Sequence, residues 1–164
     1  MSSEDKADEE IRSLYQEFNR ICCGFDLLYR TIAMKMGMSD SAFQILVAIY
    51  DLGEGCTQSQ VCAYSCLGKQ TISSSVRKLQ NNSLISLQRV NGVRGLGLFL
   101  TAKGRKVVEE RVAPVVKADI DALSAVGLED GRRLVSISQE YLRGFEQNLS
   151  RVSTPENHFS KDDE

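Results

Sequence analysis

The sequence of 164 residues predicts a mainly α-helical fold with one small β-hairpin. Apolar residues recur at steps of three and four over long segments at both ends of the chain, which is the spacing of amphipathic helices. Between these ends, Leu84 to Val90 alternates as a strand does, Asn91–Gly95 offers turn residues, and Gly97 to Leu100 can return as the second strand. The predicted order is helix, helix, short helix, helix, hairpin, helix, helix.

The terminal segments predict long helices with apolar stripes. The N-terminal stripe has coiled-coil spacing and consists of Ile11, Leu14, Phe18, Ile21, Phe25, Leu28 and Ile32. Thr101 can cap a later helix, kinked at Pro114, whose apolar face holds Val108, Val112, Val115, Val116, Ile120 and Leu123. The last helix, Leu128 to about Val152, has an apolar side of Leu134, Ile137, Tyr141, Phe145 and Leu149.

These stripes exceed what a monomer of this size would comfortably cover, which favours a homodimer. The residues predicted to join the two chains are Ile11, Leu14, Phe18, Ile137, Tyr141 and Phe145. Bundling of the helices within one chain is the alternative.

The middle of the chain predicts two helices with identifiable caps. Ser39 can cap a helix that reaches Leu52 and stops at Gly53, with an inward face of Phe43, Leu46, Val47 and Tyr50. The run Thr57-Gln-Ser-Gln60 fits a capping box, in which the two outer side chains satisfy amides that a helix start leaves unpaired. A short helix from Gln58 to about Ala63 should follow.

The stretch K-Q-T-I-S-S-S-V-R-K-L, from Lys69 to Leu79, predicts a helix with a hydrogen-bonding outward face. At about 100° per residue, its apolar side holds Ile72, Val76 and Leu79. The opposite side holds Gln70, Ser73, Ser74, Arg77 and Asn81. Short hydroxyls allow a helix to lie deep in the major groove of about 12 Å, amides suit adenine, and arginine suits guanine or phosphate.

We therefore predict contacts with double-stranded DNA along this helix and the short helix before it. The residues are Thr57, Ser59, Lys69, Gln70, Ser73, Ser74, Arg77 and Lys78. Arg94, at the hairpin tip, is suited to the negative potential of the minor groove. The alternative interpretations are a polar solvent face for the helix and an ordinary turn charge for Arg94.

The charges are segregated along the chain. The whole sequence has 20 basic and 22 acidic residues, but residues 39–111 hold 9 basic and 5 acidic ones, a net charge of +4. The remaining 11 basic and 17 acidic residues give the other segments a net charge of −6. The 54 residues between Glu54 and Glu109 contain no carboxylate, which favours a surface that meets the phosphates of a nucleic acid over a merely solvated basic face.

A short helix, a turn, a second helix and a Gly-rich hairpin make a winged helix-turn-helix, flanked here by N- and C-terminal dimerisation helices. We predict a DNA-binding domain over 39–106, a dimerisation region over 9–36 and 107–152, and disordered tails at 1–8 and 153–164.

Composition and motifs argue against several other classes. The sequence has no Gly-rich phosphate loop, no His near a nucleophile motif and no paired carboxylates in an apolar context, so we predict neither an enzyme nor a cofactor. Its five cysteines are odd in number and irregularly spaced, which fits reduced thiols. The N-terminus lacks the pattern of a secretory signal, and the longest uncharged apolar run, 41–50, is too short for a bilayer. We expect a cytoplasmic protein without a membrane partner.

The chain resembles the multiple antibiotic resistance regulator (MarR) family. The resemblance rests, in order, on S-D-S-A-F-Q-I-L, G-C-T-Q-S-Q-V, K-Q-T-I-S-S-S-V-R-K-L and V-R-G-L-G-L-F-L-T-A-K-G-R, between Ser39 and Arg105. It implies a homodimer with interlocked terminal helices, and two winged helices on successive major grooves of a palindromic operator. It also implies autorepression, relieved by a small aromatic or lipophilic effector between the dimerisation and DNA-binding parts.

Two positions depart from the pattern of the family. Gly92 stands where the family usually has an acidic residue that pairs with the wing arginine, and Gly95 and Gly97 loosen the wing further. Ser83 stands where the family commonly ends the recognition helix with Gly.

The cysteines leave two alternative mechanisms open. Some members of the family sense oxidants through a reactive Cys near the end of the first helix, and Cys22 and Cys23 lie in that predicted helix. A zinc site could use Cys56, Cys62 and Cys66, but it lacks a fourth ligand, since the single histidine, His158, lies in the tail. A further alternative is a winged helix that binds a protein instead of DNA.

Overall fold

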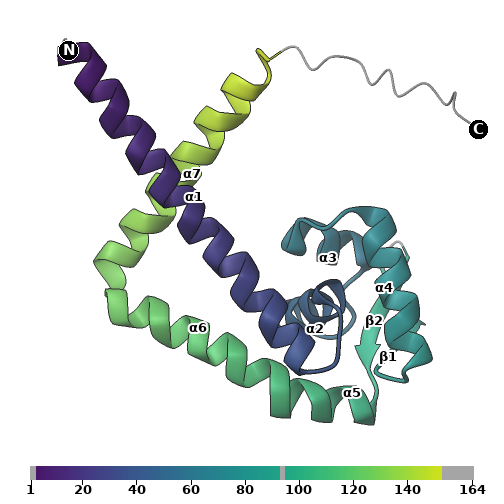
Figure 1. Cartoon of the computed structure of the whole chain (residues 1–164). Coiled ribbons are helices and arrows are strands. Elements are labelled where there is room, and N and C mark those ends of the chain that lie inside the picture. Colours follow the sequence, from purple (N-terminus) through teal and green to yellow (C-terminus); the bar gives the residue numbers. More distant parts are fainter. Residues whose placement is uncertain (1–2, 93–94, 153–164) are drawn as a thin grey trace, which may run out of the picture. The chain divides into compact units, whose positions relative to one another are not determined.

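The computed structural model describes residues 3–92 and 95–152 (Figure 1). The elements are α1 (Ser3–Lys35), α2 (Asp40–Leu52), α3 (Gln58–Ser65), α4 (Lys69–Asn81), β1 (Ile85–Arg89), β2 (Leu96–Leu100), α5 (Ala102–Val107), the π-helical turn η1 (Val108–Val112), α6 (Ala113–Val126) and α7 (Leu128–Leu149). The predicted mainly α-helical winged-helix fold and its element order are confirmed. Contacts divide the chain into two compact units, Met1–Val116 and Lys117–Glu164.

The first unit has one hydrophobic core, built around α2 and α4. The largest fully buried side chains are Phe43, Ile45, Leu46, Ile49, Val61, Ile72, Val76, Leu79, Leu98 and Val112. Phe43 and Leu46 are buried as predicted, and Val47 is partly buried against the core. The prediction for Tyr50 was wrong, because the inward stripe of α2 continues through Ile49 and leaves Tyr50 47% exposed.

The caps of α2 and α3 explain where these helices begin. The Ser39 hydroxyl accepts from the Ala42 amide, so α2 starts at the next residue after its cap. The predicted capping box is complete: the Gln60 amide donates to the Thr57 hydroxyl at 3.3 Å, and the Thr57 amide donates to Gln60 Oε1 at 2.9 Å. The helix α3 ends at Ser65, and the next residue, Cys66, caps it in the left-handed conformation with a φ of 55°.

The hairpin is antiparallel and is attached to the segment before α3. Its register pairs Ile85 with Leu100 and Arg89 with Leu96. The outer edge of β2 meets residues 55–57, because Gly55 N donates to Leu98 O at 2.7 Å and Leu98 N donates to Cys56 O at 2.8 Å. A Cβ atom at Gly97 would lie 2.6 Å from Gly55 O, so this close approach requires glycine.

The motif L-T-A-K-G, residues 100–104, closes the hairpin onto the end of α4. The Thr101 hydroxyl accepts from Gly104 N and caps α5 as predicted. Lys103 Nζ donates to Asn82 O at 3.0 Å, at the C-terminal end of α4 where carbonyls lack helical partners. A Cβ atom at Gly104 would lie 1.9 Å from Leu84 O, so no larger residue fits between α5 and the start of the hairpin.

Helix α1 is long and carries most of its apolar residues on the surface of its unit. Its 33 residues correspond to a length of about 50 Å. Only its C-terminal part joins the core, through buried Ala33 and partly buried Tyr29 and Ile32. Residues 3–8, which we expected in a disordered tail, continue this helix and correct that prediction. The predicted tail at 153–164 lies outside the described residues.

The kink predicted at Pro114 corresponds to the π-helical turn just before it. The Ala113 amide donates to Val108 O, one residue further back than in an α-helix. Pro114 has no amide hydrogen to donate to the carbonyl four residues earlier, which accounts for the irregularity here.

The second unit contains the greater part of α6, followed by α7. The two helices meet at Gly127, whose φ is 93°. No single helix in residues 3–92 and 95–152 has the length and hydropathy to cross a membrane; only α1 and α2 taken together, across a 94° bend, meet that test.

Candidate nucleic-acid interface

Helix α4 has one buried side and one exposed side. The buried side consists of Ile72, Ser75, Val76 and Leu79. The predicted DNA-contacting residues of this helix are all exposed: Lys69, Gln70, Ser73, Ser74, Arg77 and Lys78. No described residue of the first unit covers them, so they are available to a partner molecule.

Ser75 is the one polar member of the buried side, and we did not predict its burial from the sequence. It is 3% exposed, and its hydroxyl lies 2.7 Å from the Ser41 hydroxyl of α2. This hydrogen bond helps to hold α4 against α2. If the helices separated, the Ser75 hydroxyl would be left unpaired in the core, which is unfavourable. The signal was present: residues 72, 75, 76 and 79 follow the i, i+3, i+4, i+7 pattern of one helical face.

The end of α4 forms a Schellman cap around a serine. Ser83 N donates to Gln80 O at 2.8 Å, Leu84 N donates to Leu79 O at 2.9 Å, and Ser83 itself has a φ of 55°. Leu79 and Leu84 are both buried, which supplies the hydrophobic contact typical of this motif. Ser83 therefore forms the same cap that Gly would form. Because Ser83 has a side chain, its left-handed conformation is strained.

The N-terminal end of α4 is suited to an anion. Gly68 precedes the helix and provides no side-chain cap, and the first turn carries no acidic residue. Free first-turn amides and the positive end of the helix dipole favour a phosphate at this position. A shallow cavity of about 280 Å³ lies beside it, lined by Gln58, Ser59, Lys69, Ile72 and Ser73. Thr71, which the sequence analysis did not name, is also exposed in this turn.

Thr57 differs from the other predicted contact residues of α3 and α4. It is only 8% exposed, and its hydroxyl is engaged with Gln60 as both acceptor and donor. The structure therefore corrects the prediction that its side chain contacts DNA: Thr57 fixes the start of α3, whereas the exposed Ser59 two residues later faces outward.

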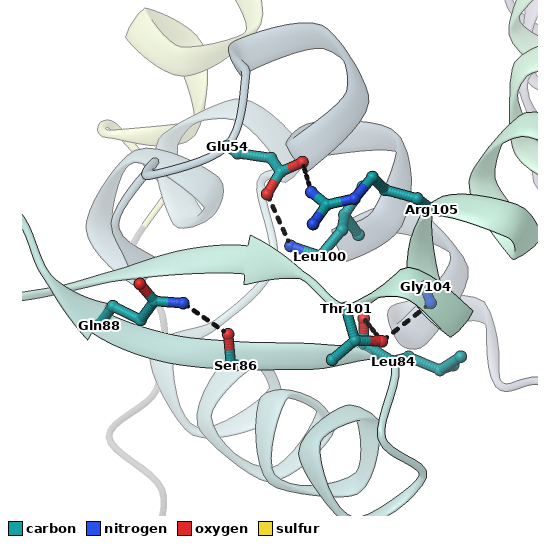
Figure 2. A network of polar contacts seen from close by, with 8 residues as sticks. All are labelled: Glu54, Leu84, Ser86, Gln88, Leu100, Thr101, Gly104 and Arg105. Atoms are coloured by element: carbon teal, nitrogen blue, oxygen red, sulfur yellow. Dashed lines mark hydrogen bonds and ion pairs between the residues drawn. The ribbon is translucent and has the colours of Figure 1, made fainter.

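The wing is anchored at its base by a polar network (Figure 2). Glu54 Oε2 accepts from Leu100 N at 3.1 Å, and its other oxygen pairs with the Arg105 guanidinium. The Thr101 hydroxyl lies 3.3 Å from Leu84 O and accepts from Gly104 N (Figure 2). Arg94, predicted for the wing tip, lies outside the described residues. Arg89, at the end of β1, is exposed.

The cysteines occupy different environments. Cys22 and Cys23 are exposed on α1, and Cys66 is exposed at the end of α3. Cys56 is buried, and its burial raises the pKa of the thiol above the ordinary value. Cys62 Sγ donates to Leu67 O at 2.9 Å. Within residues 3–92 and 95–152, no three His, Cys, Asp or Glu residues are placed to hold a metal ion, so the zinc alternative has no supporting geometry.

The residues predicted for dimerisation are exposed in the single chain. On α1 they are Ile11, Leu14 and Phe18, which are 66%, 56% and 37% exposed. On α7 they are Ile137, Tyr141 and Phe145, which are 60%, 48% and 54% exposed. In the second unit, an apolar cavity of about 590 Å³ lies at the junction of α6 and α7, with Ile120, Leu123, Leu128 and Val135 in its lining.

Comparison with known proteins links this fold to one family. A family model described as MarR family matches residues 36–94, which include α2, α3, α4 and β1. The search of curated proteins finds no match.

Several solved structures have the same fold. A MarR family regulator from Neisseria meningitidis has a TM-score of 0.68 and 21% identity, over 86% of this chain and 96% of that one. Staphylococcus aureus MepR in complex with DNA has a TM-score of 0.64 and 17% identity, over 78% of this chain and 93% of that one. Staphylococcus aureus MarR in complex with salicylate and kanamycin has a TM-score of 0.58 and 18% identity, over 92% of this chain and 100% of that one. Residues 36–94 thus match the MarR family model, and the chain shares its fold with solved MarR family regulators.

Proposed function

We propose that this protein is a sequence-specific regulator of transcription that binds double-stranded DNA as a homodimer. The observation that carries the proposal is the outward face of α4, where hydroxyl, amide and basic side chains are exposed and no carboxylate stands among them. A merely solvated helix has no need to exclude carboxylates, whereas a helix against phosphates does. The similar fold of MepR in its DNA complex supports this proposal.

The side chains of α4 divide into two roles in this proposal. Arg77, Gln70, Ser73 and Ser74 read base edges, with Arg77 contacting guanine or phosphate. Lys69 and Lys78 contact the phosphate backbone of the DNA, together with Ser59 and the amides at the start of α4.

Replacing Arg94 with Ala should weaken binding across sequences or at flanking A·T steps only, because a wing arginine reads groove width more than base identity.

The exposed stripes of α1 and α7 support the homodimer. Each helix exposes aromatic and aliphatic side chains that a single chain would leave in water, and such patches mark interaction surfaces. Two-fold symmetry would place two copies of α4 on successive major grooves of a palindromic operator and double the phosphate contacts.

We further propose a repressor that a small effector releases. A cavity of about 340 Å³ in the first unit combines apolar walls, including Met36, Met38 and Leu79, with the cations Lys78, Lys103 and Arg111. None of its described lining residues is a carboxylate. It is large enough for a small aromatic anion, and occupation would draw Lys78 away from a DNA phosphate. The salicylate complex of the similar S. aureus protein makes salicylate the first compound to try.

The effector proposal has a direct test. Salicylate should lower the DNA affinity of the parent protein, and the neutral analogue salicylamide should not, because the cavity attracts an anion. The Lys103→Gln variant should respond less to salicylate. Equal responses to the two compounds, or an unchanged response to salicylate in the variant, would refute the proposal that this cavity binds the effector.

The experiment that tests DNA binding is a fluorescence anisotropy titration with the promoter of the protein's own gene. A scrambled duplex of the same length and composition is the control. If six phosphates are contacted, affinity should fall about a thousandfold between 50 and 200 mM salt. A protein-binding winged helix with an apolar contact would instead show little salt dependence and no preference for the promoter, and that result would refute the proposal.

Thiol-based sensing is a second candidate, favoured by the exposure of Cys22 and Cys23 on α1. Oxidation of these thiols by peroxide to a sulfenate or a disulfide, on the helix that carries the proposed dimerisation stripe, would disturb the dimer. Peroxide should then release DNA from the parent protein and fail to do so in a Cys22→Ser, Cys23→Ser variant. Release that is unchanged by these substitutions would remove this mechanism.

With either effector release or thiol-based sensing, we propose that the protein acts in the cytoplasm, where its operator is accessible. It would regulate transcription by binding DNA, without catalysing a reaction. Autorepression follows if its own promoter carries the operator.

A further inference from the structure

We infer that Glu54 is a positioning residue of the wing, which sets the angle of the hairpin relative to α4 from the hairpin's base. The inference rests on the proposed DNA-binding function, since the angle matters only if wing and α4 contact one duplex. Glu54 lies between α2 and α3, far in sequence from the hairpin that it holds.

The evidence begins with the two edges of β2. One edge pairs with β1, and the other pairs with the segment before α3 through Gly55 and Cys56. Amides of alternate residues in a strand point to the same edge, so Leu98 N and Leu100 N both face this segment. Leu98 N donates to Cys56 O, and the backbone contact with this segment ends there.

The Glu54 carboxylate adds one more hydrogen bond to the outer edge of β2, beyond the last backbone bond to residues 55–56. Its Oε2 atom accepts from Leu100 N at 3.1 Å, in the position that a further strand carbonyl would occupy. Leu100 is 8% exposed, so its amide needs a partner within the protein. One side chain thus attaches the last residue of β2 to the turn that precedes α3 (Figure 2).

Arg105 fixes the carboxylate from the other side. Its guanidinium pairs with Oε1, leaving Oε2 for Leu100 N. The Glu54 and Arg105 side chains are 33% and 52% exposed, so solvent screens part of their attraction, and the pair mainly orients the carboxylate. The contact therefore joins three segments: the turn after α2, the end of β2 and the first turns of α5.

Beyond this base, the described part of the wing is held by the pairing of β1 with β2, and the residues next to the tip are glycines. Gly92 and Gly95 flank the tip with φ of 78° and 110°, conformations that glycine adopts with little restraint. Gly92 also has no side chain with which to pair an arginine. In this inference the direction of the wing depends on β2 and on its attachment to residues 54–56, which Glu54 completes.

The test compares duplexes of two lengths. The short duplex ends with the bases that α4 would cover, and the long duplex adds the A·T-rich flanks that the wing would reach. The ratio of the two affinities measures the contribution of the wing. Three full-length variants are needed. Glu54→Ala removes the acceptor for Leu100 N, and Glu54→Gln keeps an acceptor there. Glu110→Ala is the control, because it removes a carboxylate that pairs with Lys106 and not with Arg105.

We expect the parent protein to prefer the long duplex about tenfold, which corresponds to 1.4 kcal/mol. Glu54→Ala should bring this ratio close to one, while Glu54→Gln and Glu110→Ala retain most of it. The thermal unfolding midpoint of each variant should stay within a few degrees of the parent, since the pair is partly exposed. Amide exchange at Leu100 should quicken in Glu54→Ala alone, and this readout needs no DNA.

Two results would overturn the inference. An undiminished ratio in Glu54→Ala would show that the wing is oriented without the carboxylate. An equal loss in Glu54→Gln or Glu110→Ala would assign the effect to charge instead of position. Failure of the parent protein to bind either duplex would refute the proposed function, while the exchange measurement would still show whether Glu54 holds β2.

Discussion

The winged-helix region and the terminal helices bury their apolar side chains to very different extents. The buried core runs from Ala33 to Val112, and its members include residues of α2, α3, α4 and both strands. The described part of the second unit buries only Gly131, although α7 alone exposes Leu134, Val135, Ile137, Tyr141, Leu142, Phe145 and Leu149. The first region therefore has a buried core of its own, whereas the exposed apolar side chains of the terminal helices support the proposed homodimer.

The largest effect should follow a cavity in the core of the winged-helix region. Phe43 is fully buried, and its ring lies 6.4 Å from that of Tyr29, centroid to centroid. Phe43→Ala should lower the free energy of unfolding by about 3–5 kcal/mol. Urea denaturation measures this, with Phe145→Ala on α7 as the control at low protein concentration. Comparable losses from both variants would contradict the distinction between the two regions.

The second prediction concerns the partner surface. Ile137→Glu places a charge in the proposed interface and should weaken the dimer by about 2–4 kcal/mol, the range of interface hot spots. Analytical ultracentrifugation would show monomers at concentrations where the parent is dimeric, while circular dichroism stays helical. A dimer of unchanged affinity would move the interface away from α7.

A smaller effect is expected at the end of α4. Ser83 occupies a left-handed conformation that glycine adopts more readily. Ser83→Gly should raise the free energy of unfolding by about 1 kcal/mol, because the strain at the cap is relieved. Gln80→Gly, in the last turn of the same helix, should lower it by a similar amount. Destabilisation by Ser83→Gly would show that the serine side chain has a role of its own.

The smallest prediction compares thiols in and out of the core. Iodoacetamide should modify Cys22 and Cys23 before Cys56, because Cys56 is buried and its raised pKa reduces the thiolate. Burial disfavours the charged form, so raising the pH above the pKa of the unfolded thiol should favour unfolding and speed the reaction of Cys56. Peptide mass spectrometry over a pH series measures each rate. Equal rates at neutral pH would contradict the described burial.

Local signals in the sequence predicted much of the fold. The capping box at Thr57 and Gln60, the cap at Thr101 and the stripe of α4 depend on neighbouring residues, so they could be read without coordinates. The bond between Ser41 and Ser75 and the contacts of Glu54 join residues that are 34 to 51 positions apart. No local pattern reports such pairings, since they arise only when the helices and the hairpin pack.

The candidate site was predicted less completely than the fold. The exposed face of α4 followed from helical spacing, but Thr57 was assigned to DNA although its capping role already used its hydroxyl. Exposure depends on what packs nearby, and residue type alone does not give it. The predicted contacts to DNA, to a second chain and to an effector depend on molecules outside the single chain, and they stand as proposals.

The central claim is that the outward face of α4 reads DNA bases, and one measurement tests it most directly. Anisotropy titrations would compare the parent, Arg77→Ala and Lys117→Ala on the promoter duplex and on its scrambled control. Lys117 provides a matched cation, since it lies in the second unit and pairs with Asp121. We expect Arg77→Ala to lose about 1–3 kcal/mol of binding free energy on the promoter and much less on the scrambled duplex, while Lys117→Ala behaves as the parent. Equal losses for Arg77→Ala on both duplexes, or no loss on either, would contradict it.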